Sequence, residues 1–206
     1  MIKLPFALLT GTAVLALAAS SLMAQDAPAV RVDVKEVKFS TQYTPQFQGS
    51  NIIDKRWKPK SWLEVDVAFD AKKARVAGDK SMFIEGIEIK YYVALNKTDA
   101  EGKLVLLTAS INYLNIPVKD TSHALVFASP AALSRILEKD FANTDVKAVG
   151  VEVNFNGQLV GGHSSAGGKF WETNAAQFST VDGVLLPKAK TPFAPLWGDY
   201  DVDAKQ

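Results

Sequence analysis

The sequence predicts a mainly β fold in which two antiparallel sheets pack as a sandwich, with one short crossover helix. Apolar and polar side chains alternate along most of the chain beyond the first 24 residues, and such alternation buries one face of a strand and leaves the other face in water. Val, Ile, Phe and Tyr fill the apolar positions, and these residues suit a pleated surface. Roughly seven strands with few helical patterns indicate the immunoglobulin-like type of β-sandwich, although the Cys–Trp–Cys signature of that type is missing.

The strands follow from their apolar rows, taken in chain order. Val30, Val32 and Val34 share one phase, and the phase shifts by one residue at Val37 and Phe39, which predicts a β-bulge. Four further rows repeat the same alternation. They are Leu63, Val65, Val67 and Phe69; Ile87, Ile89, Tyr91, Val93 and Leu95; Val105, Leu107, Ala109, Ile111 and Tyr113; and Val149, Val151, Val153 and Phe155.

The connections agree with this order. Asn96–Lys103 is polar and contains glycine, so it predicts a hairpin between two long strands. Asn156-Gly157 is a tight-turn dipeptide that leads into a strand at Gln158–Val160, and Asp182-Gly183 is a second turn signal. Thr41–Lys60 is long, polar and contains Pro and Gly, which predicts a surface loop.

One helix is predicted after a strand at Ala124–Ala128. Ser129 suits the N-cap position and Pro130 suits the first helical position. The apolar residues that follow fall on one helical face. They are Leu133, Ile136, Leu137 and Phe141. The helix crosses over to the strand that contains Val149.

The first 24 residues predict a signal peptide. A positively charged start at Lys3 precedes an apolar stretch, and small residues end at Ala24 before the polar Gln25. Cleavage after Ala24 is expected, with a site after Ser21 as the alternative. Neither site precedes a Cys, so a bacterial lipid anchor on the first mature residue is not expected. The prediction is an exported protein, located in the periplasm, on the outer surface or outside the cell, without a transmembrane anchor after cleavage. Residues 25–186 form the β-sandwich domain and residues 187–206 form a tail.

The amino-acid composition excludes several classes of function. The chain has no Cys, which excludes thiol catalysis, disulfide exchange and thiolate metal sites. The net charge is +1, and without Lys3 the basic and acidic side chains balance. Nucleic acid is therefore not an expected partner, because its binding requires clustered Lys and Arg.

The tail from Pro187 combines prolines with apolar and aromatic side chains. Its prolines exclude a helix or a central strand, but it is too apolar for a free linker. It either wraps over an edge or an open end of the sandwich or serves as an extended docking peptide for another subunit. The residues predicted to bind a partner are Phe193, Leu196, Trp197, Tyr200 and Trp57.

The tail segment Thr191-Pro192-Phe193-Ala194-Pro195-Leu196-Trp197, with the export signal and the cysteine-free β chain, resembles the pilus-like protein family of verrucomicrobial bacteria of the Akkermansia type. The resemblance implies an immunoglobulin-like fold and a role in surface or pilus assembly, and it carries no catalytic residue onto this sequence. The N-terminus departs from a type IV pilin. Gly11 is the one early glycine, and the fifth residue after it is Ala16 where such a pilin has Glu. Polymerisation as a type IV pilin subunit is therefore not expected.

No constellation for catalysis, metal or cofactor binding is recognised. His123 and His163 are expected to be surface or loop residues. Gly161–Gly168 is expected to be a flexible hairpin or loop tip, and it lacks the elbow of a serine hydrolase and the motif of a phosphate loop. The acidic residues of the tail have the spacing of the first ligands of a calcium loop, but Gly and a closing Glu are missing. They are Asp199, Asp201 and Asp203, and they are expected to be solvated.

The leading hypothesis is a non-enzymatic, exported adhesion or assembly protein that binds a protein partner in the cell envelope or pilus through edge strands or the tail. The alternative is a carbohydrate-binding module, suggested by four Trp residues that stack on sugars or fill the core. They are Trp57, Trp62, Trp171 and Trp197. A periplasmic enzyme with a scattered site is the third hypothesis. The basic residues around Trp57 predict a solvated loop, with an anionic polymer or acidic partner as the other option. They are Lys55, Arg56, Lys58 and Lys60.

Overall fold

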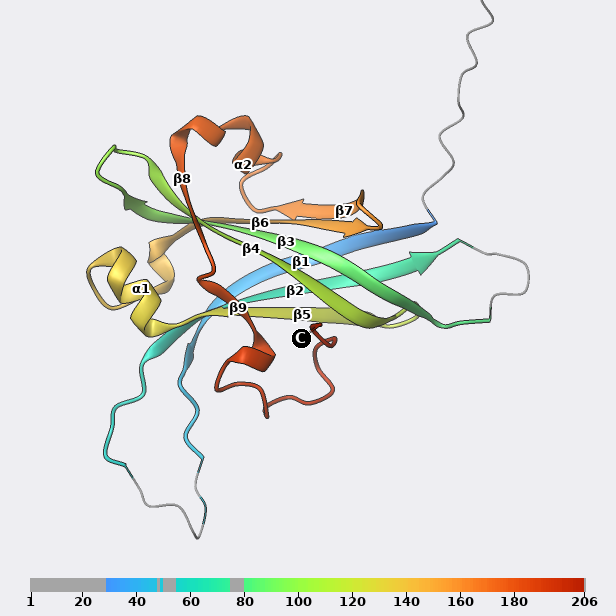
Figure 1. The fold of residues 1–206 in the computed structure, drawn as a ribbon, viewed down its shortest axis with the longest axis horizontal. Helices are drawn as coiled ribbons and strands as arrows, with labels where there is room; N and C mark the ends of the chain where they lie inside the picture. Colours follow the sequence, from blue (N-terminus) through green and yellow to red (C-terminus); the bar gives the residue numbers. More distant parts are fainter. Residues whose placement is uncertain (1–28, 48, 50–54, 75–79, 206) are drawn as a thin grey trace, which may run out of the picture.

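A computed structural model describes residues 29–47, 49, 55–74 and 80–205. The predicted signal peptide lies outside the described residues. Two β-sheets face each other across one apolar core (Figure 1). Sheet A has the strand order β1 (Val30–Tyr43), β2 (Ser61–Lys73), β5 (Thr121–Ala128) and β9 (Leu185–Pro187). Sheet B has the order β7 (Gln158–Ser164), β6 (Val146–Phe155), β3 (Phe83–Thr98), β4 (Leu104–Pro117) and β8 (Phe178–Asp182).

The mainly β prediction is confirmed, with two corrections. The sheets are not entirely antiparallel, because β8 pairs with β4 in parallel. The chain reaches β8 through α2 (Phe170–Thr173) and the 3-10 turn η2 (Ala175–Gln177), which bring it to the end of sheet B where β4 begins. The second correction is that α2 adds a second α-helix to the predicted one. Two further 3-10 turns are η1 (Asn143–Asp145) and η3 (Lys188–Lys190).

The predicted helix is α1 (Pro130–Leu137), and it crosses from β5 in sheet A to β6 in sheet B. The Ser129 hydroxyl accepts a hydrogen bond from the Ala132 N–H at 3.2 Å, which satisfies a free donor of the first turn. The helix ends at Leu137, and Glu138 takes a left-handed conformation with φ 60°. Phe141 therefore lies beyond the helix, although its side chain is still buried.

The predicted apolar rows face the interior. The register of β1 against β2 shifts between Val34 and Glu36, which confirms the bulge. Within the core, the hydroxyls of Tyr91 and Tyr113 are 2.6 Å apart, and the Tyr113 hydroxyl donates to the Leu125 carbonyl of sheet A at 3.4 Å. Burial raises the pKa of both hydroxyls, so they remain neutral donors. This contact joins the two sheets without a disulfide.

The turns behave as predicted in three places and differ in two. Asn156 and Gly157 both have positive φ, as a two-residue hairpin turn requires, and the hairpin of β3 and β4 is antiparallel. Gly183, with φ 74°, turns the chain from sheet B to sheet A. The predicted loop Thr41–Lys60 is shorter, because β1 continues to Tyr43. The predicted loop Gly161–Gly168 is also partly strand, because β7 continues through Ser164 by pairing with β6.

The expectation that each strand has one wet face is wrong for β6. Its outward residues Gly150, Glu152 and Asn154 are buried. The Trp171 ring of α2 covers Gly150, Lys169 forms an ion pair with Glu152, and Asn154 donates a hydrogen bond to Glu88 of β3. The Trp171 ring stacks on Tyr92 at 4.4 Å between centroids. Hydrogen bonds from Lys169 and Tyr92 outweigh the effect of burial and hold the pKa of Glu152 below its usual value.

The same expectation is wrong for β5, which the tail covers on the opposite side of the molecule (Figure 1). Phe193 is 1% exposed, and it stacks on Phe127 at 4.5 Å and meets the Trp62 ring edge-on at 5.5 Å. The last described residues then pair with β4, where Ala204 forms a bridge with Tyr113. The tail therefore wraps over its own domain in this structure.

A buried ion pair fixes the path of the tail. Lys188 Nζ lies 2.5 Å from Asp201 Oδ1, and the two side chains are 9% and 12% exposed. Lys188 also donates to the Trp197 carbonyl at 3.2 Å. Asp201 is therefore not the solvated tail residue that the sequence predicted, because the chain folds back and closes a loop on Lys188.

We expect Gly150→Ala to destabilise the fold by about 1–3 kcal/mol, because its new Cβ would overlap the Trp171 ring. Urea unfolding measures the change. Gly198→Ala is the control, since nothing lies within 4 Å of a Cβ at that position. Equal stability of both variants would contradict the packing described for α2.

Asp201→Asn is expected to lower the free energy of unfolding by about 3 kcal/mol, because it leaves the buried Lys188 ammonium without a counter-charge. Chemical denaturation provides the measurement, and faster proteolysis of the tail should accompany the loss. Glu172→Gln removes a similar contact to Lys169 from an exposed pair and should change stability by less than about 1 kcal/mol.

Candidate functional site

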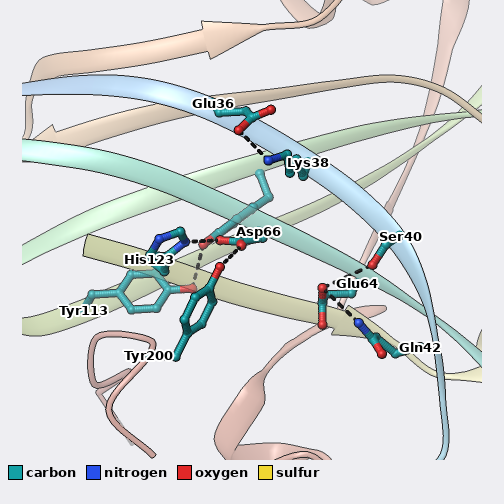
Figure 2. Close-up of polar contacts among 10 residues, drawn as sticks. Glu36, Lys38, Ser40, Gln42, Glu64, Asp66, Tyr113, His123 and Tyr200 are labelled. Carbon is teal, nitrogen blue, oxygen red and sulfur yellow. Dashed lines mark hydrogen bonds and ion pairs between the residues drawn. The ribbon is translucent and has the colours of Figure 1, made fainter. Parts of the chain in front are cut away.

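The outer face of sheet A carries a polar cluster that the strand alternation places there. Val65 and Val67 point into the core, so Glu64 and Asp66 of β2 point outward. Ser40 and Gln42 of β1 and His123 of β5 flank them in the register of the sheet. The tail lies against this face. Figure 2 shows the resulting polar contacts.

Asp66 binds both a neighbouring strand and the tail. His123 Nδ1 lies 2.9 Å from one carboxylate oxygen, and the Tyr200 hydroxyl donates to the other at 2.6 Å (Figure 2). The His123 and Tyr200 rings stack at 4.2 Å, and the Val202 N–H donates to the His123 carbonyl at 2.8 Å. Burial, together with the hydrogen bond to Asp66, raises the pKa of Tyr200. This part of the cluster holds the Tyr200 ring in a fixed orientation.

Within the described part of the chain, the hydrogen-bond partners of Glu64 are neutral. Its Oε1 accepts from the Ser40 hydroxyl at 3.2 Å and from the Gln42 amide at 3.4 Å (Figure 2). Burial raises the pKa of Glu64, and the two hydrogen bonds offset this only in part. The basic side chain nearest along β1, Lys38, forms an ion pair with Glu36 at 2.7 Å. Among the described residues, no ion pair compensates the charge of Glu64.

Trp197 has an unusual backbone conformation for a bulky residue, with φ 54°. The hydrogen bond from Lys188 Nζ to its carbonyl supports this conformation, and the Phe193 ring stacks beside its indole at 6.2 Å. The Trp197 side chain remains 43% exposed. Strained residues of this kind persist only where the surroundings determine them, and they cluster at functional positions.

These groups surround a cavity of about 220 Å³, which we call the tail cavity. Its polar lining comes from Gln42, Glu64 and Asp66, and two aromatic side chains of the tail complete its walls. The lining residues are Gln42, Glu64, Asp66, Leu125, Trp197 and Tyr200. Leu125 also lines the cavity but is only 2% exposed. The arrangement offers acceptor oxygens, an amide and two aromatic rings to a ligand.

The structure separates the predicted partner-binding residues into three groups. Trp197 and Tyr200 border the tail cavity and are 43% and 46% exposed. Phe193 is buried and Leu196 packs beside it, so these two anchor the tail to sheet A. Trp57 is 48% exposed on the connection between β1 and β2, and the ring contacts found in the described ranges do not link it to the tail.

Other predicted sites do not assemble. Trp62 is buried under the tail, and Trp171 of α2 is buried against sheet B, so the four Trp residues do not share one platform. His163 lies on β7, whereas His123, expected on the surface or in a loop, lies on β5 with a 24% exposed side chain. In the part of the chain that the structure describes, no group of three or more His, Cys, Asp or Glu residues could hold a metal ion.

Gln42, Glu64, Asp66 and His123 were not predicted as site residues. Glu64 and Asp66 have the pattern of ordinary outward positions of a strand, Gln42 falls in the predicted loop Thr41–Lys60, and His123 was expected to be a surface or loop residue. One signal was available in β5. Leu125 and Phe127 interrupt the alternation with apolar side chains on the outward face. A short strand that is apolar on both faces indicates that another segment covers it.

No helix in the described ranges is long and apolar enough to cross a membrane.

Comparisons with known proteins place the chain in a family. No curated protein matches the chain. A crystal structure of a protein from Akkermansia muciniphila matches with a TM-score of 0.76 and 26% identity, over 86% of this chain and 94% of that chain. A family model for pilus-like proteins matches residues 23–206. The chain therefore belongs to the pilus-like protein family of verrucomicrobial, Akkermansia-type bacteria.

Proposed function

We propose that this chain is an exported, pilus-associated protein of the cell envelope that acts without catalysis in adhesion or assembly. Family membership supports the association with pili, and the N-terminal pattern supports export. We further propose that the two packed sheets form an immunoglobulin-like sandwich, for which the strand count and the packing of two sheets over one core are the support.

The binding surface in this proposal is the exposed side of the docked tail, formed by Trp197 and Tyr200 together with the tail cavity. The observation that carries it is the rigid presentation of Trp197: its backbone has φ 54°, a buried Lys188 binds its carbonyl, and its ring remains 43% exposed. Trp and Tyr dominate the energetics of protein interfaces. A side chain that is already ordered loses little entropy on binding.

A binding role accounts for the Asp66–His123 pair better than catalysis does. Asp66 holds His123 Nδ1, as the acid of a catalytic triad would. The His123 ring, however, stacks against Tyr200, whose hydroxyl is itself bound to Asp66. The pair therefore orients an aromatic side chain of the binding surface, and we propose that the protein is not an enzyme.

A carbohydrate-binding module is the second candidate. The specific support is Trp197, which lies beside a cavity lined by the Gln42 amide and two carboxylates, since aromatic rings and polar side chains together bind sugars. A glycan array with the mature protein tests it. Glycan signals that disappear in Trp197→Ala would favour the carbohydrate-binding function, and an array without any signal would rule that function out.

We expect the mature protein to begin at Gln25 and to occur in the envelope or the medium of the producing bacterium, because the leader has the pattern of a cleavable signal. Fractionation followed by intact-mass measurement checks both points, with Leu22 as the start if cleavage follows Ser21. A cytoplasmic product that retains Met1 would contradict export.

Photocrosslinking tests the binding surface. Asp199 is exposed between the two rings in sequence, so benzoylphenylalanine at this position leaves both rings intact. We expect adducts with envelope proteins in the producing cells, and their loss when Trp197→Ala is added. Leu159, 50% exposed on β7, is the control position on sheet B. Equal adducts at both positions, or none at position 199, would contradict the proposed surface.

A further inference from the structure

We propose that the tail cavity binds the cationic end of a lysine or arginine side chain presented by a protein partner. The inference rests on the proposed function and deepens it, because it names the chemistry of the partner for the same surface. It follows from the charge, the walls and the size of the cavity.

The charge of the cavity is negative. Glu64 and Asp66 both line it, and no lysine or arginine is among its lining residues. Asp66 already accepts hydrogen bonds on both oxygens, from His123 and from Tyr200. Among the described residues, Glu64 accepts hydrogen bonds from the neutral donors Ser40 and Gln42, both on the same oxygen. Its second oxygen, Oε2, is therefore the acceptor that a cationic group would use.

The neighbouring lysines have partners of their own. Lys38 lies opposite Asp66 in the register of β1 and β2, but its ammonium is 2.7 Å from Glu36 and its side chain is 67% exposed. Lys188 of the tail is bound to Asp201, and its ammonium lies 6.0 Å from the centroid of the Trp197 ring. A carboxylate that is partly removed from water without a counter-charge carries a desolvation cost. Burial accordingly raises the pKa of Glu64, and a bound cation would relieve that cost.

The walls of the cavity suit a long basic side chain. Trp197 and Tyr200 supply aromatic rings, and the face of such a ring attracts an ammonium or guanidinium group. The same rings also give an apolar surface to the methylene stem that carries the charge. Lysine and arginine combine these two requirements in one side chain.

The size of the cavity favours a single side chain over an oligosaccharide. Its volume is about 220 Å³, whereas pockets for drug-sized small molecules span about 300–1,000 Å³. A neutral sugar would also leave the charge of Glu64 uncompensated. The cavity therefore fits the end of one basic side chain that projects from a larger protein surface.

The test is a titration of the mature protein in which NMR spectra monitor the indole N–H resonance of Trp197. The probes are the methylamides of N-acetyl-lysine and N-acetyl-arginine. N-acetyl-norleucine methylamide is the uncharged counterpart of the lysine probe, and methyl glucoside and N-acetylglucosamine represent sugars. Titration extends to about 50 mM, because one side chain is expected to bind with a millimolar Kd.

We expect saturable shifts with the cationic probes, weaker at high salt, and little change with norleucine or the sugars. Glu64→Gln keeps the shape and the hydrogen bonds of the side chain but removes its charge, and it should weaken binding about tenfold. Glu172→Gln, which removes an exposed carboxylate on α2, should leave binding unchanged. The Trp197 resonance of each variant confirms that the tail remains docked.

Absence of shifts with the cationic probes, equal shifts with norleucine, or unchanged binding in Glu64→Gln would overturn the inference. Saturable shifts with the sugars alone would overturn it in favour of the carbohydrate candidate. Crosslinks from position 199 that persist when Glu64→Gln is introduced, together with no cation binding, would leave the protein-binding surface standing and remove only the cationic chemistry. The two proposals therefore fail in different experiments.

Discussion

The buried ion pair between Lys188 and Asp201 is the interaction on which the functional surface depends. It closes the tail on itself at 2.5 Å with both side chains nearly buried. A buried charge without its partner is strongly unfavourable, so the pair permits few alternative paths for the tail. The same ammonium binds the carbonyl of Trp197, which stabilises the positive φ of that residue. One buried lysine thus sets the path of the tail and the orientation of its exposed indole.

Apolar packing outside the central core holds the tail against sheet A. Phe193 enters a cluster with Trp62 and Phe127 on the outer face of sheet A, and Trp171 forms an equivalent cluster with Tyr92 on sheet B. A cysteine-free chain must stabilise its sandwich by burial, and these covers extend the buried surface beyond the space between the sheets. The tail covers only part of sheet A, so the cavity beside Glu64 remains open at its margin.

The candidate site therefore combines two kinds of order. The sheet fixes the carboxylates, because strand alternation sends Glu64 and Asp66 outward from a rigid core. The tail supplies the aromatic rings, which the Asp66 hydrogen bond and the Phe193 stack hold in place. Groups from elements far apart in sequence meet in a preorganised surface. Such a surface binds at low entropic cost, which suits the binding role that we propose for this member of the pilus-like family.

The sequence alone determined β1 to β7, the bulge near Val34 and the capped helix at Ser129, because these follow from local periodicity and from side-chain bonds to the nearby backbone. The short strands β8 and β9 were not predicted. The sequence did not reveal the parallel pairing of β8, the cover over Gly150 or the cavity beside Glu64. Each of these depends on where a distant segment lies against the sheet, and periodicity contains no information on that contact. Trp197 could be recognised as apolar and important from the tail composition. Only tertiary packing decided that Phe193 would be buried while Trp197 remained on the surface. The Phe193 ring packs against Trp62 of β2 and Phe127 of β5.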